Sequence, residues 1–371
     1  MFKTVLFSLS VCIFLGLILF RFSPSVEKCD KLVVVAMPHN PAVPFDPRWY
    51  TLEYYEYLKV LFPNDKYKTK EWFVSFNNID LFLDDMQKLA KIDNEIVVLN
   101  LCDGGEWDGY PGITLMKKWE EHPVSKIVRM TGADTEFLWH SDHKARMQTH
   151  IHHAGLPTLP DLLLPHGRIS SILENGKLDL LLVKEGLNEK WPLFIKLNIG
   201  AGALGVNALS VNHDLSSLKA KIVELHKNFP NSDLLIQPFL SGPEYTVLIL
   251  HNTAIAAARR EFNNPYQIVI GPQQLDLAGT EYGTKFGPAP DDVKELALKA
   301  VRAMPGIHHY SRVDVRADES GNLFVIDIND RPGFGPSNTL NIMLEYLQMD
   351  EADFIQRVVD SASILSRPQS D

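Results

Sequence analysis

Hydrophobic and polar positions follow two different periods along the first third of the chain. Short apolar runs of strand length alternate with amphipathic stretches of helix length. The strand-like runs lie at residues 33–36, 72–76, 96–101 and 126–130, and the helical stretches include residues 51–62 and 79–91. This alternation is typical of a doubly wound α/β subdomain, which we place at residues 31–130.

The pattern after residue 130 predicts a second α/β domain, at residues 131–365. A helix is expected at about residues 135–154, because Gly155 and Pro157 follow and would end it. Strand-like segments then continue to about residue 269. We divide this domain into a middle lobe at about 131–270 and a C-terminal lobe at about 271–365.

Oxygen-bearing side chains alternate with apolar ones in two segments of the expected C-terminal lobe. Asp314 lies between two valines, and Asp327 and Asn329 flank Ile328. Residues two apart on a strand leave the same face, so these side chains could hold a hard cation such as Mg²⁺. A solvated edge strand, on which Asp blunts pairing, is the alternative.

A lysine near the end of an apolar strand precedes a glycine-rich loop. Lys196 is followed by Gly200, Gly202 and Gly205. Glycines let backbone N–H groups approach phosphate oxygens, and the lysine adds positive charge, so the segment suits a nucleoside triphosphate. It is neither a Walker A loop nor the dinucleotide fingerprint. A glycine-rich hairpin turn is the alternative.

Residues 233–250 predict two strands joined by a short connector. The connector could present backbone groups to an adenine ring, and Glu244, at the start of the second strand, could bind a ribose hydroxyl. An ordinary hairpin between two core strands is the alternative. The order of all three segments in one chain favours a nucleotide site.

Together these segments resemble the ATP-grasp superfamily, and within it the D-alanine–D-alanine ligase-like enzymes. The likeness covers about residues 97–347. It rests on Gly155-Leu-Pro157, Ile195-Lys196, the glycine loop, Leu240-Ser-Gly-Pro-Glu244-Tyr-Thr-Val, Arg312-Val-Asp314-Val and Asp327-Ile-Asn329-Asp-Arg-Pro-Gly333. The resemblance implies a pre-ATP-grasp subdomain followed by a two-lobed ATP-grasp domain.

The resemblance also implies a ligase that uses ATP and Mg²⁺, with Mn²⁺ as an alternative cation. Such an enzyme phosphorylates a carboxylate to an acyl phosphate, which an amine then attacks. The implied metal ligands are Asp314, Asp327 and Asn329, with Asp327 where these ligases generally carry Glu. The implied catalytic groups are Arg312 and the backbone N–H of Gly333, which would stabilise negative charge on the acyl group.

The nucleotide-binding residues follow from the same resemblance. They are Lys144, Lys196, Gly200, Gly202, Gly205, Gln237, Phe239, Glu244 and Lys285. Gln237 stands in the adenine hinge where the family usually has Glu, and it can still accept and donate hydrogen bonds. Lys285 is assigned to a loop that closes over ATP, with an ordinary solvated lysine as the alternative.

The match weakens where substrates would bind. The loop after the first strand has no equivalent of the family's Glu, and Cys102-Asp103 replaces the family's His-Gly. We therefore do not predict formation of D-alanyl-D-alanine. The expected partners are a carboxylate and an amine from among small amino acids, peptides or specialised metabolites, and a homodimer is compatible with the sequence.

Net charge and the first residues bear on other partners and on location. A formal net charge of −10 and the lack of a Lys/Arg run argue against nucleic-acid binding. Residues 1–22 are strongly apolar, which predicts a signal peptide or, as we favour, an uncleaved membrane anchor with a stem at 23–30. The flanking basic residues favour a cytosolic catalytic domain, with a lumenal or secreted one as the alternative.

Two other classes of function remain compatible with the sequence. One is an inactive nucleotide-binding regulator of a membrane partner, which ATP turnover would distinguish from a ligase. The other is a membrane-anchored glycosyltransferase, which would need an Asp-x-Asp metal motif that neither Asp84-Asp85 nor Asp291-Asp292 supplies.

Overall fold

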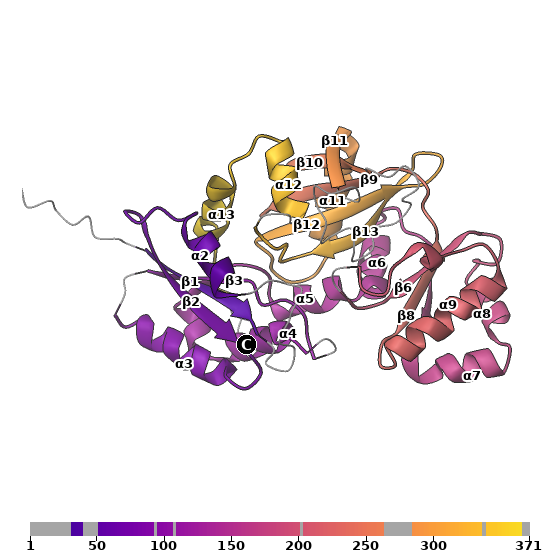
Figure 1. The fold of residues 1–371 in the computed structure, drawn as a ribbon, viewed down its shortest axis with the longest axis horizontal. Helices are drawn as coiled ribbons and strands as arrows, with labels where there is room; N and C mark the ends of the chain where they lie inside the picture. Colours follow the sequence, from indigo (N-terminus) through magenta and orange to yellow (C-terminus); the bar gives the residue numbers. More distant parts are fainter. Residues whose placement is uncertain are drawn as a thin grey trace, which may run out of the picture.

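The computed structural model describes residues 31–39, 51–92, 95–106, 109–200, 203–262, 284–335 and 339–365. Three sheets and the helices that cover them make up this part of the chain (Figure 1). The predicted anchor at residues 1–22 and stem at 23–30 lie outside these ranges. Within the ranges, no helix combines the length and the apolar character needed to cross a membrane.

The first sheet is parallel and has helices on both faces. Its strand order is β2-β1-β3-β4. The strands are β1 (Lys31–Pro38), β2 (Tyr67–Val74), β3 (Ile96–Asn100) and β4 (Arg129–Met130), and the nearby helices are α2 (Leu52–Lys59), α3 (Ile79–Leu89), α4 (Gly112–Glu121) and the 3-10 helix η1 (Pro123–Lys126). This arrangement confirms the predicted α/β class.

Alternate residues of β1 enter two different cores, which shows how the layers are stacked. Val34 packs in a core with residues of α3 and α4. Val33 and Val35 pack in a second core with residues of α2 and of α13 (Glu351–Asp360). A parallel sheet covered on both faces is buried throughout, as its continuous apolar strands require. The last helix of the described chain thus returns to the first sheet, beside α2 (Figure 1).

Two predicted elements differ from those observed. The run at 126–130 forms only the two-residue strand β4, because residues 123–126 form η1. The helix expected at 135–154 is two helices, α5 (Thr135–Asp142) and α6 (Lys144–His153). His143 between them has ψ 95°, and there the backbone N–H of Lys144 donates to the Asn198 carbonyl at 3.0 Å.

The second sheet is antiparallel, with strand order β5-β8-β6-β7, and carries its own core. Helices α7, α8 and α9 supply the other apolar residues of that core. The strands are β5 (Leu162–Leu164), β6 (Leu193–Leu197), β7 (Val211–Asn212) and β8 (Leu234–Pro238), with α7 (Ile169–Glu174), α8 (Leu178–Lys184), α9 (Leu215–Asn228) and the 3-10 helices η2 (His166–Arg168) and η3 (Ala208–Ser210).

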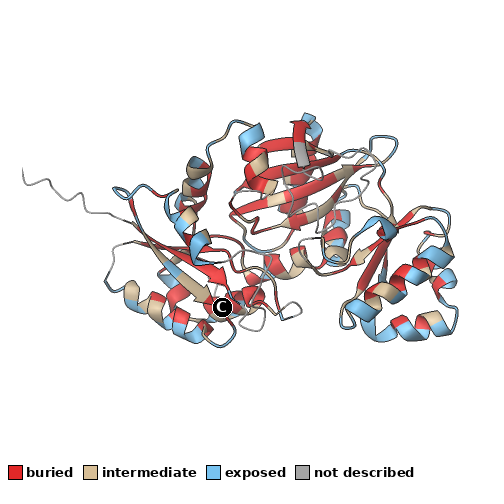
Figure 2. Ribbon diagram, viewed as in Figure 1, coloured by how far each residue is buried: buried red, intermediate tan, exposed pale blue. Residues whose placement is uncertain are grey.

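The third sheet is also antiparallel, with strand order β11-β10-β9-β12-β13. Its central strand is buried along its whole length, which appears as continuous red in Figure 2. The strands are β9 (Glu244–Leu250), β10 (Thr253–Phe262), β11 (Thr284–Pro288), β12 (Tyr310–Ala317) and β13 (Leu323–Asn329), with α11 (Asp291–Ala303) and α12 (Thr339–Tyr346).

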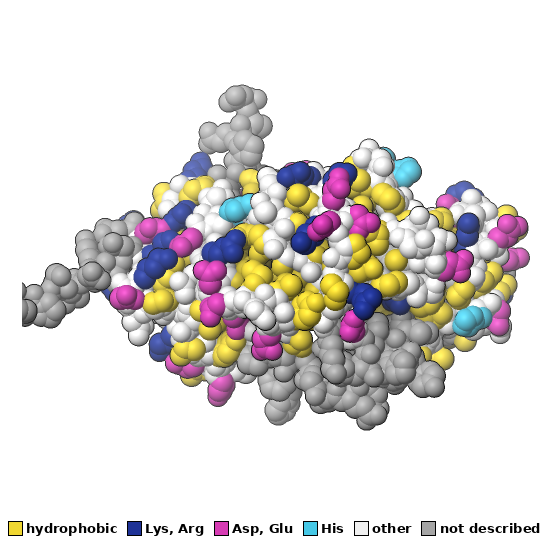
Figure 3. Space-filling model, turned by 90° about the horizontal axis from the view of Figure 1, so that it is seen from above, with side chains coloured by type: hydrophobic (Ala, Val, Ile, Leu, Met, Phe, Trp, Pro, Cys, Tyr) yellow, Lys and Arg dark blue, Asp and Glu magenta, His cyan; other side chains and the backbone are white. Residues whose placement is uncertain are grey.

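Successive side chains of β9 point to opposite faces of the third sheet and enter the two cores that also flank the first sheet. Val247 and Ile249 pack in the core that holds α11, and Leu248 packs in the core that holds residues of α12 and α13. On the face shown in Figure 3, lysine and arginine side chains are interspersed with aspartate and glutamate. The expectation about nucleic acid stays a prediction.

Candidate functional site

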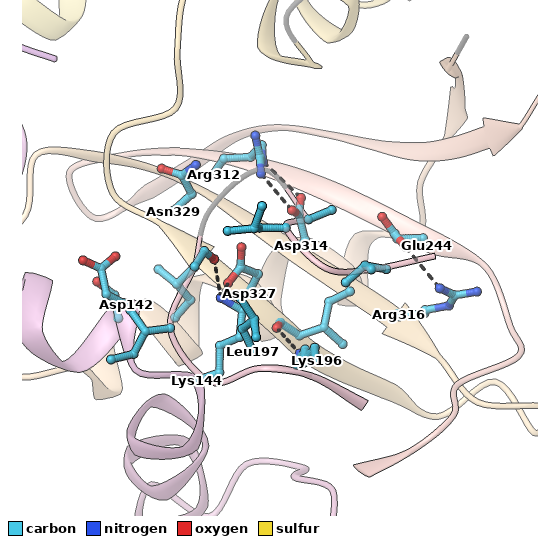
Figure 4. A pocket seen from close by; sticks show the side chains of 18 of the residues that line it. Asp142, Lys144, Lys196, Leu197, Glu244, Arg312, Asp314, Arg316, Asp327 and Asn329 are labelled. Carbon is cyan, nitrogen blue, oxygen red and sulfur yellow. Dashed lines mark hydrogen bonds and ion pairs between the residues drawn. The ribbon is translucent and has the colours of Figure 1, made fainter. Parts of the chain in front are cut away.

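The described residues line a cavity of about 240 Å³ between the second and third sheets. Strands β6 and β8 contribute one wall, strands β12 and β13 contribute another, and the end of α5 and start of α6 close one side. Figure 4 shows that charged side chains from these elements gather there. Most of the residues singled out from the sequence therefore meet in one place.

Four charged or polar side chains form a compact group across β12 and β13. In the strand register Arg312 lies opposite Asn329, and Asp314 lies opposite Asp327. Residues two apart share a face, and directly opposite residues of an antiparallel pair have Cβ atoms about 5 Å apart. All four line the cavity. We call Arg312, Asp314, Asp327 and Asn329 the cross-strand group.

Asp314 is the most tightly held member of this group. Arg312 donates to both of its oxygens, from Nε at 3.2 Å and from a terminal nitrogen at 3.0 Å, and the Thr246 hydroxyl donates to Oδ1. Burial disfavours its charged form, but the guanidinium groups of Arg312 and Arg260 outweigh burial and hold the pKa of Asp314 below its ordinary value. The carboxylate is therefore ionised and preorganised.

The oxygens of the cross-strand group fit a hard cation. Asp327 remains 32% exposed in its side chain and lies 3.3 Å from Lys144 Nζ, while Asn329 Oδ1 accepts from the Arg331 backbone N–H at 3.0 Å. The described residues hold no group of three His, Cys, Asp or Glu side chains placed to bind a metal by themselves. Two carboxylates and an amide nevertheless suit Mg²⁺, which commonly takes few protein ligands and completes its shell with water and substrate phosphates.

Two lysines line the same cavity, Lys144 at the start of α6 and Lys196 on β6. Lys144 Nζ donates to the Gly200 carbonyl at 3.0 Å, and Lys196 Nζ donates to the Ile326 carbonyl at 3.3 Å. Burial and the neighbouring Lys144 ammonium lower the pKa of Lys196 to about 8. Figure 4 shows the Lys144 side chain in contact with Asp327. Such a pair of lysines suits a polyanion, which would relieve their mutual repulsion.

An apolar slot beside β8 has the properties of a ring-binding site. Gln237 and Phe239 line it, and the rings of Phe194 and Phe239 are 6.4 Å apart. The Arg316 guanidinium lies 5.1 Å from the Phe239 ring centre. Gln237 Nε2 is buried without a hydrogen-bond partner among the described residues, so an acceptor on a bound ligand or a water molecule would satisfy it.

Glu244 is held by two arginines that the sequence did not indicate as its partners. Its two oxygens face Arg260 at 3.2 Å and Arg316 at 3.4 Å, and Figure 4 shows the contact with Arg316. Burial raises the pKa of Glu244 above its ordinary value, against the effect of both guanidiniums. Glu244 also lines the cavity, so one carboxylate joins the slot to the cross-strand group.

The predicted nucleotide-binding glycines and Lys285 differ in their relation to the cavity. Gly200 lines the cavity, whereas Gly205 is not among the described lining residues and supports packing, since a Cβ there would lie 2.9 Å from a Leu225 methyl. Gly202 lies outside the described residues. Lys285 is on β11 opposite Glu261, and its side chain lies outside what the structure describes.

Gly333 follows β13 and stands two positions beyond Arg331, which does line the cavity. Gly333 itself is not among the described lining residues. Its assignment, like that of the other site residues, therefore remains a prediction about the loaded site.

A buried charged cluster at the α5 end of the cavity was missed by sequence reasoning. It consists of Asp142, Asp330 and Arg331, with Asp103 nearby. Arg331 bonds to the Cys102 carbonyl and lies 2.9 Å from Asp330. Burial and the Asp330 carboxylate raise the pKa of Asp142 to about 8. Asp330 and Arg331 are adjacent in the motif at residues 327–333, but no local motif links them to Asp142 or Asp103.

Arg260 and Arg316 were also missed. They lie on β10 and β12, one strand away from Glu244 on either side, at register positions directly opposite it. Only the sheet order, which the sequence did not provide, brings the three together.

Comparisons with known proteins identify the family that the chain matches. A family model described as D-ala D-ala ligase C-terminus matches residues 152–360. A D-alanine–D-alanine ligase from Marinomonas sp. (strain MWYL1) is 24% identical over 202 residues, which cover 54% of this chain and 61% of that protein. One from Haemophilus influenzae (strain PittEE) is 29% identical over 144 residues, covering 38% and 46%. The chain thus matches less than two thirds of the length of either relative.

Solved structures show the same fold over more of the chain. The crystal structure of a D-alanine–D-alanine ligase from Bacillus anthracis has a TM-score of 0.63 at 16% identity and covers 89% of this chain and 97% of that one. The complex of that organism's ligase with ATP has a TM-score of 0.62 at 14% identity, with 89% and 96% covered. At these identities the likeness establishes the fold.

Proposed function

The chain belongs to the D-alanine–D-alanine ligase family within the ATP-grasp superfamily, and we propose that it is an ATP- and Mg²⁺-dependent carboxylate–amine ligase. One observation carries this proposal. The cross-strand group faces Lys144 and Lys196 across one cavity, so hard oxygen ligands and two phosphate-binding cations share a space. A ring slot with an unsatisfied buried amide lies in the same cavity.

Different residues of the cavity are proposed to bind different parts of the nucleotide. Gln237 and Phe239 would hold the adenine, with Glu244 beside them for a ribose hydroxyl. Lys144, Lys196 and the Gly200 backbone would neutralise the phosphates. Asp314, Asp327 and Asn329 would hold Mg²⁺, which when bound supplies charge neutralisation between adjacent phosphate groups.

Arg312 is placed to act on the reacting carboxylate. It shares a face with the metal ligands and its guanidinium is fixed by Asp314. A fixed donor aimed at developing negative charge needs no reorganisation during reaction, which is why such groups contribute strongly to rate. The proposed reaction forms an acyl–oxygen–phosphorus link as ADP leaves. The amine then forms the C–N bond as phosphate leaves and loses one proton to solvent.

The substrates are proposed to be small amino acids or similar compounds, and not two D-alanines. Asp103 lines the cavity where the sequence departs from the family. The adjacent Cys102 is fully buried, and burial raises the pKa of its thiol, so Cys102 is an inert packing residue rather than a nucleophile. A departure from the family's pattern at a residue that lines the cavity supports a changed substrate.

Phosphate release tests the function. The full chain is incubated with ATP, Mg²⁺ and pools of amino acids and small amines, beside the Asp327→Ala variant. Release that depends on a pool and is lost in the variant supports the ligase. ATP binding without stimulation by any pool would favour the nucleotide-binding regulator instead.

We also propose that residues 1–22 anchor the protein in a membrane with the catalytic part in the cytosol. The support is the apolar run at these residues and the basic residues that flank it. Extraction of membranes with alkaline carbonate tests anchoring, and protection from protease in sealed vesicles tests the side. Release into the soluble fraction would refute the anchor.

A further inference from the structure

One peptide bond of the loop after β13 is held at both of its polar ends. The loop comprises residues 333–335. The Tyr54 hydroxyl donates to the carbonyl of Phe334 at 2.9 Å. The N–H of Gly335, on the same peptide plane, donates to Asn341 Oδ1 at 2.9 Å and to Glu351 Oε1 at 3.1 Å. A plane bonded at both ends cannot rotate without losing a hydrogen bond.

Tyr57 joins the two acceptors of that N–H. Its hydroxyl donates to Glu351 Oε2 and accepts from Asn341 Nδ2 at 3.4 Å. Burial is the main cause, and the Glu351 carboxylate the second, of a raised pKa of Tyr57, so the phenol stays protonated and remains a donor at neutral pH. Asn341 is only 6% exposed. Tyr57, Asn341 and Glu351 therefore form one continuous network that ends on the loop backbone, and with Tyr54 we call it the loop clamp.

Aromatic packing also holds this loop. Phe334 is fully buried, with its ring 6.0 Å from that of Tyr310 and 6.1 Å from that of Phe354. This packing holds the Phe334 side chain but supplies no hydrogen bond to the backbone. The hydrogen bonds of the loop clamp supply the missing restraint.

The clamp comes from parts of the chain that are distant in sequence. Tyr54 and Tyr57 lie on α2, which covers the first sheet, whereas Asn341 and Glu351 lie on α12 and α13. The segment that matches the family model begins at residue 152, so α2 lies outside it. The first subdomain thus contacts the loop that carries Gly333.

We propose that Tyr57 and Glu351 are positioning residues that fix the Phe334–Gly335 peptide and, through it, the course of the loop that carries Gly333, whose N–H is assigned to the acyl group under the proposed function. This inference rests on the proposed ligase function. Donors to developing negative charge act over a narrow range of distance, and misplacement by about 1 Å can cost about 100-fold in rate. The clamp would therefore affect turnover more than nucleotide binding.

The test compares Tyr57→Phe with Tyr55→Phe in the full chain. Tyr55 lies on the same helix, and its hydroxyl bonds to Thr69 Oγ1 at 3.1 Å, away from the loop, so it controls for loss of a hydroxyl from α2. We expect Tyr57→Phe to lower kcat at least about tenfold with KM for ATP unchanged, and Tyr55→Phe to leave both near wild type. Glu351→Ala should resemble Tyr57→Phe, Glu351→Gln should recover part of the loss, and the double variant should be no worse than either single variant.

Hydrogen exchange separates failure of the clamp from failure of the function. The Gly335 amide, which donates to Asn341 and Glu351, should lose protection in Tyr57→Phe and keep it in Tyr55→Phe. Lost protection with no substrate-dependent turnover in wild type would leave the clamp standing and refute the ligase. Unchanged kcat in an active Tyr57→Phe protein, or unchanged protection, would overturn the positioning role.

Discussion

Lys196 makes nucleotide affinity depend on pH in a direction that the structure determines. In the free protein, burial and the Lys144 ammonium lower its pKa to about 8 from an ordinary value of 10.5. A bound triphosphate would sit against the ammonium and favour its protonated form. The complex therefore binds more protons than the free protein above about pH 8, so affinity must fall as pH rises through that range.

The size of the effect follows from the gap between the two pKa values. Once pH exceeds the free-protein pKa, affinity falls about tenfold for each pH unit, which is about 1.4 kcal/mol. If phosphates restore the ordinary pKa, the decline continues to about pH 10 and totals ~3 kcal/mol. Below about pH 8 affinity should be level with respect to this group.

Calorimetric titration with a non-hydrolysable ATP analogue and Mg²⁺, from about pH 7 to about pH 9.5, measures the decline. Lys196→Arg is the control, because a guanidinium stays protonated throughout, so its curve should be shallower than that of the wild type. Lys144→Met should move the onset to higher pH, since Lys144 is the second cause of the low pKa of Lys196. A wild-type curve no steeper than that of Lys196→Arg would refute the reasoning.

Three further variants test other parts of the site. Asp327→Ala should abolish ATP turnover but leave the thermal unfolding midpoint near wild type, because the Asp327 side chain is 32% exposed; full activity in the folded variant would refute the metal assignment. Burial raises the pKa of Asp142 to about 8, so the folded protein favours its protonated form. The free energy of unfolding of the wild type should therefore fall from about pH 4 to about pH 8, and in Asp142→Asn this fall, measured by urea unfolding, should be smaller by more than ~1 kcal/mol. Parallel pH profiles of the two proteins would contradict this. Gly112→Ala should lower the free energy of unfolding by ~1–3 kcal/mol in the same assay, because its Cβ would lie 2.5 Å from the Asp103 carbonyl. Gly167→Ala is the control and should be near neutral, because its Cβ would meet nothing within 4 Å. Equal losses in the two variants would show that the clash at residue 112 is relieved.

Local periodicity predicted much of the fold because its signals lie within single segments. The runs at 33–36 and 96–101 are strands β1 and β3, and their continuous apolar character reflects burial on both faces. The break at His143 could not be predicted in the same way. It depends on Asn198, more than fifty residues away, whose carbonyl and side chain bond to the backbone of Lys144 and Ala145.

The same contrast holds at the site. The members of each pair are two residues apart in the sequence, so strand geometry alone places Arg312 with Asp314, and Asp327 with Asn329, on one face. Their meeting across the strands needs the register of β12 with β13. The sequence signal for Arg260 is absent for a similar reason, because its partner Glu244 lies on a different strand and the pairing is a property of the sheet.

Charge balance in the cavity leads to a last prediction. Six Lys/Arg and six Asp/Glu side chains line it, although the whole chain carries a formal charge of −10. Burial raises the pKa of Asp142, Asp330 and Glu244, and it lowers that of Lys196, so each of these groups gains a proton more readily when an anion enters.

A Mg²⁺ complex of ATP adds a net charge of about −2, so its binding should take protons up from solution at about pH 8. Titration in two buffers that differ in ionisation enthalpy measures the number directly. By linkage that number must equal the slope of log affinity against pH in the same range, whatever groups are responsible. Lys196→Arg should lower both quantities by the same amount. Equal heats in the two buffers would show that these buried groups do not sense the nucleotide.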